Sequence, residues 1–145
     1  MRVTDLLKKK DDTPLITVKA TDSLKEAIKK LDYERIGATL VVNDRGRLVG
    51  MLSERDLIGV FAEYGDRALL VNVGALMTRR VFGCTPDDDI EDVMAWMVQH
   101  RVRHLPVVEG GRVQGMVSIG DVVKHLMNET EKEPLILEDV VVAEG

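Results

Sequence analysis

Two short phrases in the chain place a serine three residues before an aspartate, directly after apolar residues: "GMLSERD" at residues 50–56 and "GMVSIGD" at residues 115–121. Such a serine hydroxyl can accept a hydrogen bond from an amide in the first turn of a helix, and the carboxylate can bond back to the serine amide. The remaining amides of a helix N-terminus suit a phosphate, and a carboxylate one turn later suits two ribose hydroxyls. The phrases therefore predict helix caps, either alone or combined with contacts to a nucleotide. The paired residues are Ser53 with Asp56 and Ser118 with Asp121.

Both phrases belong to a longer internal repeat, because residues 16–42 align with residues 82–108 at an offset of 66. Apolar runs at residues 38–42 and 105–108 predict buried strands, each followed by a glycine-containing turn, a returning strand and a second helix. The preceding helices share apolar positions with the spacing of one helix face, Leu24, Ala27, Ile28 and Leu31 in the first copy and Ile90, Val93, Met94 and Met97 in the second.

Each copy therefore predicts the order strand, helix, strand, strand, helix. One unit of this size buries too little apolar surface to be stable alone, so we expect the two units to pack together. The predicted fold class is α/β (α+β), with two pseudo-twofold-related β-α-β-β-α repeats packed sheet against sheet. The predicted segments are an N-terminal lead-in (1–15), a first repeat (16–65), a linker with a short helix (66–80), a second repeat (81–129) and a C-terminal tail (130–145).

The composition excludes several classes of function. The 145 residues carry a net charge of −5, which argues against a nucleic-acid partner and against attraction to an acidic membrane surface. No apolar stretch approaches the ~20 residues of a membrane span, and the single cysteine cannot form an internal disulfide. A cytoplasmic location is the resulting expectation.

The residues with catalytic or metal-binding potential do not form a recognised set. His100 and His104 are four residues apart, but no glutamate completes a zinc signature, so no metal site is predicted. Cys84 lies in a predicted strand, which is more typical of a small buried hydrophobe than of a nucleophile. The sequence contains no Walker loop and no serine–histidine–aspartate order, so we predict no catalytic residue and no catalytic cofactor.

Three longer segments carry a family resemblance: "IGATLVVNDRGRLVGMLSERDLI", "LMTRRVFGCTPDDDIEDVMAWM" and "VRHLPVVEGGRVQGMVSIGDVV". Together they resemble tandem cystathionine-β-synthase (CBS) domains, most of all those of small stand-alone bacterial CBS-pair proteins, over residues 3 to 129. The resemblance implies a disk-like pair, the Bateman module, which often forms a homodimer. It also implies binding of adenosine-containing ligands such as AMP, ADP, ATP, S-adenosylmethionine or NAD(H) in clefts between the repeats.

The resemblance further implies which residues share a cleft. One cleft would combine Asp56 with Arg103, His104, Ser118 and the amide of Gly120, and the mirror cleft would combine Asp121 with Ser53 and Arg55. Gly37 and Ala38 match Arg103 and His104 in the repeat, so we expect the two clefts to differ and at least one of them to bind an adenine nucleotide. For the adenine, residues near Thr17, Val18 and Ile36, or Cys84 and Val102, could form an apolar slot.

Simpler interpretations stay open at this point. The serines and aspartates could be caps only, Arg103 and His104 could be a surface pair, and Arg55 could pair with Asp56 or Glu54. The leading hypothesis is a non-catalytic regulatory module that senses adenine nucleotides or dinucleotides, as an energy or redox sensor for a separate protein. The alternative is a ligand-independent domain for dimerisation or partner docking, and a third is a small enzyme acting on a nucleotide phosphate.

Overall fold

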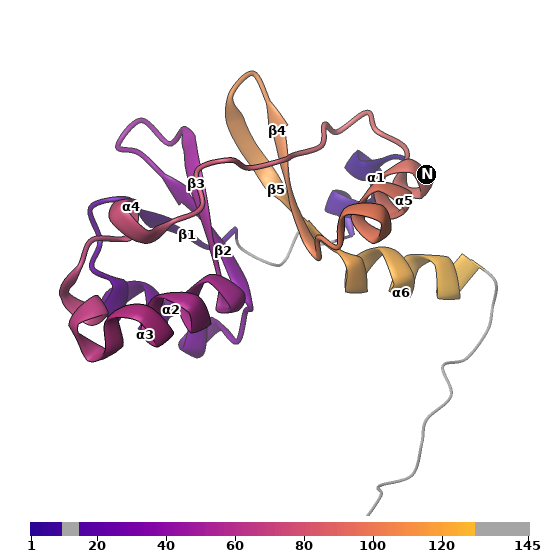
Figure 1. Ribbon diagram of the computed structural model, residues 1–145. Coiled ribbons are helices and arrows are strands. Elements are labelled where there is room, and N and C mark those ends of the chain that lie inside the picture. Colours follow the sequence, from indigo (N-terminus) through magenta and orange to yellow (C-terminus); the bar gives the residue numbers. More distant parts are fainter. Residues whose placement is uncertain (10–14, 130–145) are drawn as a thin grey trace, which may run out of the picture.

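Helices and strands follow one another in the order that the internal repeat predicts, except for the first strand of the second repeat, in a computed structural model that describes residues 1–9 and 15–129 (Figure 1). The predicted tail at residues 130–145 lies outside the described residues. The first half contains α1 (Val3–Lys8), β1 (Thr17–Lys19), α2 (Leu24–Glu34), β2 (Ala38–Val42), β3 (Leu48–Ser53) and α3 (Glu54–Tyr64). The second contains the 3-10 helix η1 (Gly65–Leu70), α4 (Val73–Leu76), α5 (Ile90–His100), β4 (His104–Glu109), β5 (Arg112–Ser118) and α6 (Ile119–Glu129).

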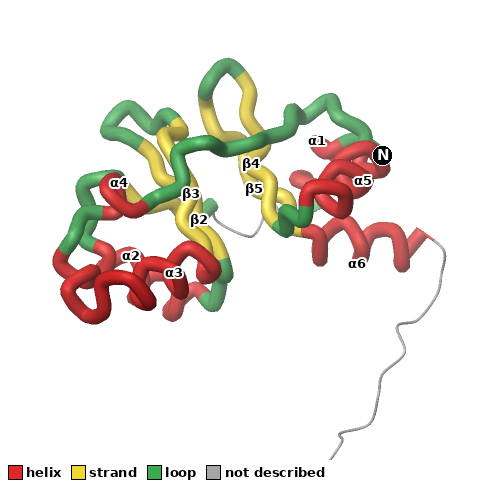
Figure 2. The backbone as a smooth tube through the Cα atoms, in the orientation of Figure 1, coloured by secondary structure: helices red, strands yellow, loops and turns green. Residues whose placement is uncertain are grey.

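The two repeats form two small sheets that lie side by side. In the first sheet β1 is parallel to β2, and β2 is antiparallel to β3; in the second, β4 is antiparallel to β5. An antiparallel bridge between Arg47 and Arg112 connects the two hairpins. Figure 2 shows the strands of both repeats in the middle of the molecule and the helices on the outside. The chain therefore has the predicted fold, two related units of mixed helix and strand packed sheet against sheet.

The first strand of the second repeat is shorter than predicted. Cys84, which the sequence places in a strand, forms a single parallel bridge with Val107. Its amide donates to the carbonyl of Pro106 at 2.9 Å. Ladder bonds beyond this bridge would need the amides of Pro106 and Pro86, and proline has no N–H group. In the first repeat the position of Pro86 is held by Ala20, whose amide donates to Val42 at 3.4 Å.

The N-terminal helix completes the second repeat, and a helix of the linker completes the first in the same way. The amide of Val3 in α1 donates to the carbonyl of Asp88 at 2.8 Å, and the amide of Val73 in α4 donates to the carbonyl of Asp22 at 2.8 Å. Both valine side chains are fully buried. The predicted lead-in thus contributes apolar surface to the distant repeat, while residues of the linker belong to the core of the repeat that precedes it.

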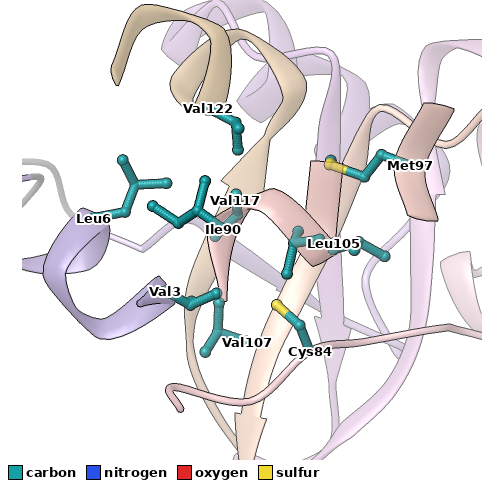
Figure 3. Close-up of a cluster of buried hydrophobic side chains, with 10 residues drawn as sticks. Val3, Leu6, Cys84, Ile90, Met97, Leu105, Val107, Val117 and Val122 are labelled. Carbon is teal, nitrogen blue, oxygen red and sulfur yellow. The ribbon is translucent and has the colours of Figure 1, made fainter. Parts of the chain in front are cut away.

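The buried apolar side chains form one cluster in each repeat. Figure 3 shows Val3 and Leu6 of α1 next to Ile90 and Val117 in the second cluster. The first cluster joins both ends of its repeat through Val18, Leu24, Ala27, Val41, Leu52, Ala68, Val73 and Met77. Within residues 1–9 and 15–129, no helix is long and apolar enough to cross a membrane.

Close packing of these short helices explains the glycine that opens each phrase. A Cβ atom on Gly50 would lie 2.5 Å from the Sδ atom of Met77, and one on Gly115 would lie 2.7 Å from the Cδ2 atom of Leu7. Met77 follows α4 and Leu7 lies in α1. The two glycines therefore leave room for matching side chains at matching places in the two repeats.

Candidate ligand-binding cavities between the repeats

Reciprocal hydrogen bonds hold the serine and the aspartate of each phrase together. The amide of Ser53 donates to Oδ2 of Asp56 at 3.0 Å, and the amide of Asp56 donates to Oγ of Ser53 at 3.2 Å. Ser118 and Asp121 form the same two bonds, both at 3.0 Å. The predicted helix caps are thereby confirmed at α3 and α6. Each pair lies at a corner where a strand ends and a helix begins.

The first cavity lies between the start of α6 and the loop that follows α2, and has a volume of about 680 Å³. Ser118 and Asp121 come from the second repeat, and the first repeat contributes an apolar wall that includes Ile36 and Ala38. We call it cavity 1; its lining is Leu7, Leu15, Ile16, Glu34, Arg35, Ile36, Gly37, Ala38, His104, Gln114, Gly115, Met116, Ser118 and Asp121.

The second cavity lies at the corresponding place around the start of α3, and has a volume of about 730 Å³. Ser53 and Arg55 face the end of α5 and the segment that leads into β4. We call it cavity 2; its lining is Gly37, Ala38, Met51, Ser53, Glu54, Arg55, Met97, Val98, Arg101, Val102, Arg103, His104 and Ile119.

The two cavities share a wall. Gly37, Ala38 and His104 line both of them. Ala38 and His104 begin β2 and β4, and they pair with Ser53 and Ser118 respectively in the two hairpins. The shared wall therefore lies where the two repeats meet, and a change at this wall reaches both cavities.

A sequence model of the CBS domain matches this chain twice, at residues 3–63 and 73–128. The chain belongs to the CBS-domain family. These two matches correspond to the two repeats that form the cavities, so cavities 1 and 2 lie between paired CBS domains.

Solved structures of CBS-domain proteins share this fold. A CBS-domain containing protein, ATU1752 from Agrobacterium tumefaciens, is 36% identical, with a TM-score of 0.80 over 87% of this chain and 99% of that chain. The CBS domain pair of protein MJ0100, in complex with 5′-methylthioadenosine and S-adenosyl-L-methionine, is 26% identical, with a TM-score of 0.77 over 89% and 98% of the two chains. CBSX2 in complex with AMP is 25% identical, with a TM-score of 0.75 over 89% and 98%.

The CBS pair brings many of the sequence-predicted residues to the cavities, in a different combination from the implied one. Ser118 lies with Asp121 in cavity 1, and Arg103 lies with Ser53 and Arg55 in cavity 2. Capping bonds hold Ser118 and Asp121 together at cavity 1, whereas Ser53 lines cavity 2 without its capping partner Asp56. Of the other predicted residues, Ile36 lines cavity 1, Val102 lines cavity 2, and Gly37 and His104 line both.

The remaining predicted residues do not line either cavity: Asp56, Gly120, Thr17, Val18 and Cys84. The carboxylate of Asp56 accepts hydrogen bonds from the amide and hydroxyl of Ser53, and from the Thr78 hydroxyl at 3.2 Å. A ligand contact of Asp56 stays a prediction. The side chains of Val18 and Cys84 lie instead in the two hydrophobic clusters.

Burial also determines the chemistry of Cys84. Removal of the thiol from water, together with the negative charge of Asp88, raises the pKa of Cys84 to about 11. The group is therefore a neutral thiol near pH 7, and the thiolate needed for nucleophilic attack is rare.

The sequence interpretation missed the arginine that ends the first helix of each CBS repeat. Arg35 and Arg101 close α2 and α5 in the left-handed conformation, with φ of 54° and 55°. Arg35 lines cavity 1 and Arg101 lines cavity 2. Arg35 and Arg101 are 66 residues apart, which is the offset of the internal repeat. This match at the end of the predicted helices was the signal that could have identified them.

The histidine pair weighed as a metal site has other contacts. His100 stacks on Trp96 with the ring centroids 4.2 Å apart, and its Nδ1 atom lies 3.0 Å from the Trp96 carbonyl oxygen. His104 lies in the shared wall instead. In the part of the chain that the structure describes, no group of three or more histidine, cysteine, aspartate or glutamate side chains is arranged to hold a metal ion.

Proposed function

We propose that this CBS pair is a non-catalytic regulatory module that binds an adenosine-containing ligand between its repeats. The observation that carries the proposal is the pairing of two cavities with two capped corners, Ser118–Asp121 at cavity 1 and Ser53 at cavity 2. Both volumes fall in the range of small-molecule sites, about 300–1,000 Å³. Family relatives support the ligand class, because MJ0100 was solved with 5′-methylthioadenosine and S-adenosyl-L-methionine, and CBSX2 with AMP.

Cavity 1 offers complementary groups for an adenosine. The Asp121 carboxylate would accept hydrogen bonds from the vicinal ribose hydroxyls. Ile36, Ala38 and Met116 would supply an apolar surface for the adenine ring. The polar corner and the apolar wall belong to different repeats, so a bound ligand would contact both.

Regulation would follow from this bridging position. A ligand that binds one packing of the two repeats better than another shifts the equilibrium between them, and about 1–3 kcal/mol of coupling is typical. The ligand would be AMP, ADP, ATP, NAD(H) or a related adenosine compound, and the signal would pass to a separate regulated protein. An energy or redox sensor is the role we favour, and a cytoplasmic location stays a prediction from the sequence.

A homodimer is part of the same proposal. Figure 1 shows α2, α3 and α6 along one side of the molecule. Large apolar side chains are exposed on each of these helices: Tyr33 by 84%, Ile58 by 72% and Val123 by 36%. In a homodimer these side chains would lie in the contact between the two copies, because a contiguous apolar surface is what marks a protein interface. They also favour the alternative function, a domain that only dimerises or docks a partner.

Calorimetry with AMP and 5′-methylthioadenosine tests the proposal, with Asp121→Asn as the variant and Asp89→Asn, at the cap of α5, as its matched control. Loss of a charged acceptor should weaken 5′-methylthioadenosine binding about 10-fold or more in Asp121→Asn. Both substitutions remove one charge and weaken one cap, but only Asp121 lines a cavity. An oligomer that binds no adenosine compound at millimolar concentration would favour the docking alternative.

A further inference from the structure

The two cavities differ in charge although their backbones correspond. Among the residues that the structure describes, cavity 2 is lined by three arginines and one glutamate, whereas cavity 1 is lined by one arginine and two carboxylates. We propose that cavity 2 is the site for an adenosine ligand that carries a polyphosphate, and cavity 1 the site for an adenosine derivative without phosphate. This inference rests on the proposed function and assigns a ligand class to each of its sites.

The arginines of cavity 2 are placed to receive an anion. Arg55 lies in the first turn of α3, Arg101 ends α5, and Arg103 precedes β4, so three separate segments converge on one cavity. Among the side chains that the structure describes, the salt bridges are Arg2–Asp87 and Lys19–Asp44, and neither involves an arginine of cavity 2. A guanidinium group can donate two parallel hydrogen bonds to the oxygens of a phosphate. Several positive charges around one cleft also attract an anion strongly.

Cavity 1 lacks cations at the corresponding positions. The repeat places Gly37 opposite Arg103 and Gly120 opposite Arg55. The Cβ atoms and longer side chains that carry charge in cavity 2 are therefore absent at both places. A phosphate group in cavity 1 would instead lie near the carboxylates of Glu34 and Asp121, which disfavour an anion.

The conformation of Arg101 adds a further indication. A left-handed residue at the end of a helix is most often glycine, because a side chain raises the energy of this conformation. With φ at 55°, Arg101 lines cavity 2 despite that cost, as Arg35 with φ at 54° lines cavity 1. Such a departure from the favoured residue is typical of functional sites.

The experiment compares ATP and 5′-methylthioadenosine by calorimetry on the full chain. The double variant Arg55→Gln with Arg103→Gln removes two charges from cavity 2. Its matched control is Arg45→Gln with Arg67→Gln, which removes two charges from exposed arginines that line neither cavity. Asp121→Asn is the corresponding variant of cavity 1.

Four results support the inference together. The cavity 2 variant should bind ATP at least about 10-fold more weakly, and its affinity for 5′-methylthioadenosine should change less than about 2-fold. Asp121→Asn should show the reverse: weaker binding of 5′-methylthioadenosine and nearly unchanged binding of ATP. The control should bind both compounds as the natural chain does. Protein saturated with ATP should still bind 5′-methylthioadenosine. A higher salt concentration should lower the affinity for ATP but not the affinity for 5′-methylthioadenosine.

Three other results would overturn it. If both compounds bind but the cavity 2 variant leaves ATP affinity unchanged, or if ATP displaces 5′-methylthioadenosine, the division by charge is wrong while the proposed function stands. If neither compound binds the natural chain, the proposed function fails and this inference fails with it.

Discussion

Gly37 and Arg103 hold the same place in the two repeats. The carbonyl of Gly37 accepts a hydrogen bond from the amide of Glu54 at 2.9 Å, and the carbonyl of Arg103 accepts one from the amide of Ile119 at 2.9 Å. The backbone hydrogen bond at each corner is therefore the same. The side chains differ, because Gly37 has none and Arg103 carries a positive charge. The duplicated fold builds two equivalent cavities, and side chains at such matched positions make them different.

Replacement of Arg101 by glycine should stabilise the fold and weaken ATP binding at the same time. Glycine adopts the left-handed conformation without steric cost, so the free energy of unfolding should rise by about 1 kcal/mol. Urea unfolding measures the first effect and calorimetry the second. Arg35→Gly is the matched control, because Arg35 has the same conformation but lines cavity 1. Equal loss of ATP affinity in the two variants would contradict the assignment of the phosphate to cavity 2.

Substitution of Gly50 by alanine should destabilise the chain by about 1–3 kcal/mol, the usual range for forcing extra atoms into a packed core. The new Cβ atom would meet Met77 and would also lie 3.0 Å from the carbonyl oxygen of Thr78, which belongs to the backbone. Gly115→Ala should cost less, because the new atom would meet only the flexible side chain of Leu7.

Gly59→Ala is the control for this pair, since Gly59 lies in α3 and a Cβ atom added there would have no neighbour within 4 Å. Alanine is favoured over glycine inside a helix, so this variant should gain about 0.5–1 kcal/mol. Urea midpoints for the three variants give the order. A Gly50→Ala protein as stable as Gly59→Ala would show that Met77 and Thr78, which follow α4, do not pack closely on β3.

Cys84 should make stability fall with alkaline pH. Its pKa is raised to about 11 in the folded chain, so between pH 9 and 11 the unfolded chain loses this proton while the folded chain keeps it. The contribution is complete below pH 9 and is lost as pH rises through this range. Cys84→Val introduces the residue found at the matching position, Val18.

Urea unfolding of the natural chain and Cys84→Val at pH 8 and at pH 10.5 measures this effect. All other groups titrate in both proteins, so the difference between them isolates the thiol. The natural chain should lose more stability than the variant. Identical losses would mean that the thiol is not held neutral by burial.

Ile58→Glu should convert a dimer into a monomer if the side formed by α2, α3 and α6 is the contact between two copies. A charge placed in an apolar interface is desolvated without a partner, which weakens association. Light scattering after size-exclusion chromatography gives the mass. Leu70→Glu is the control, because Leu70 in η1 is 85% exposed and lies outside these helices. A monomeric natural chain, or a dimer unaffected by Ile58→Glu, would exclude this interface.

Local patterns in the sequence predicted most of the fold. The capping pairs at Ser53 and Ser118, the apolar faces of α2 and α5, and the glycine-containing hairpin turns each depend on residues close in the chain. The repeat then implied that both halves share one architecture. The bridge at Cys84 was the exception, and the prolines at 86 and 106 give its physical reason.

The composition of each cavity depended on contacts that local patterns do not encode. The packing of one repeat on the other determines which corner faces which loop. Ser118 and Asp121 therefore share cavity 1 with Ile36 of the other repeat. The role of α1 was hidden for the same reason, because Val3 packs with Ile90, far along the chain. Arg101 was missed because arginine is not a usual left-handed cap.

A crystal structure of the full chain with ATP and 5′-methylthioadenosine present together tests the central claim most directly. The account predicts the phosphates of ATP within hydrogen-bond distance of Arg55 and Arg103, and the ribose of 5′-methylthioadenosine at the carboxylate of Asp121. Electron density for both compounds at places outside the two cavities, or cavities that stay empty at saturating concentrations, would contradict it.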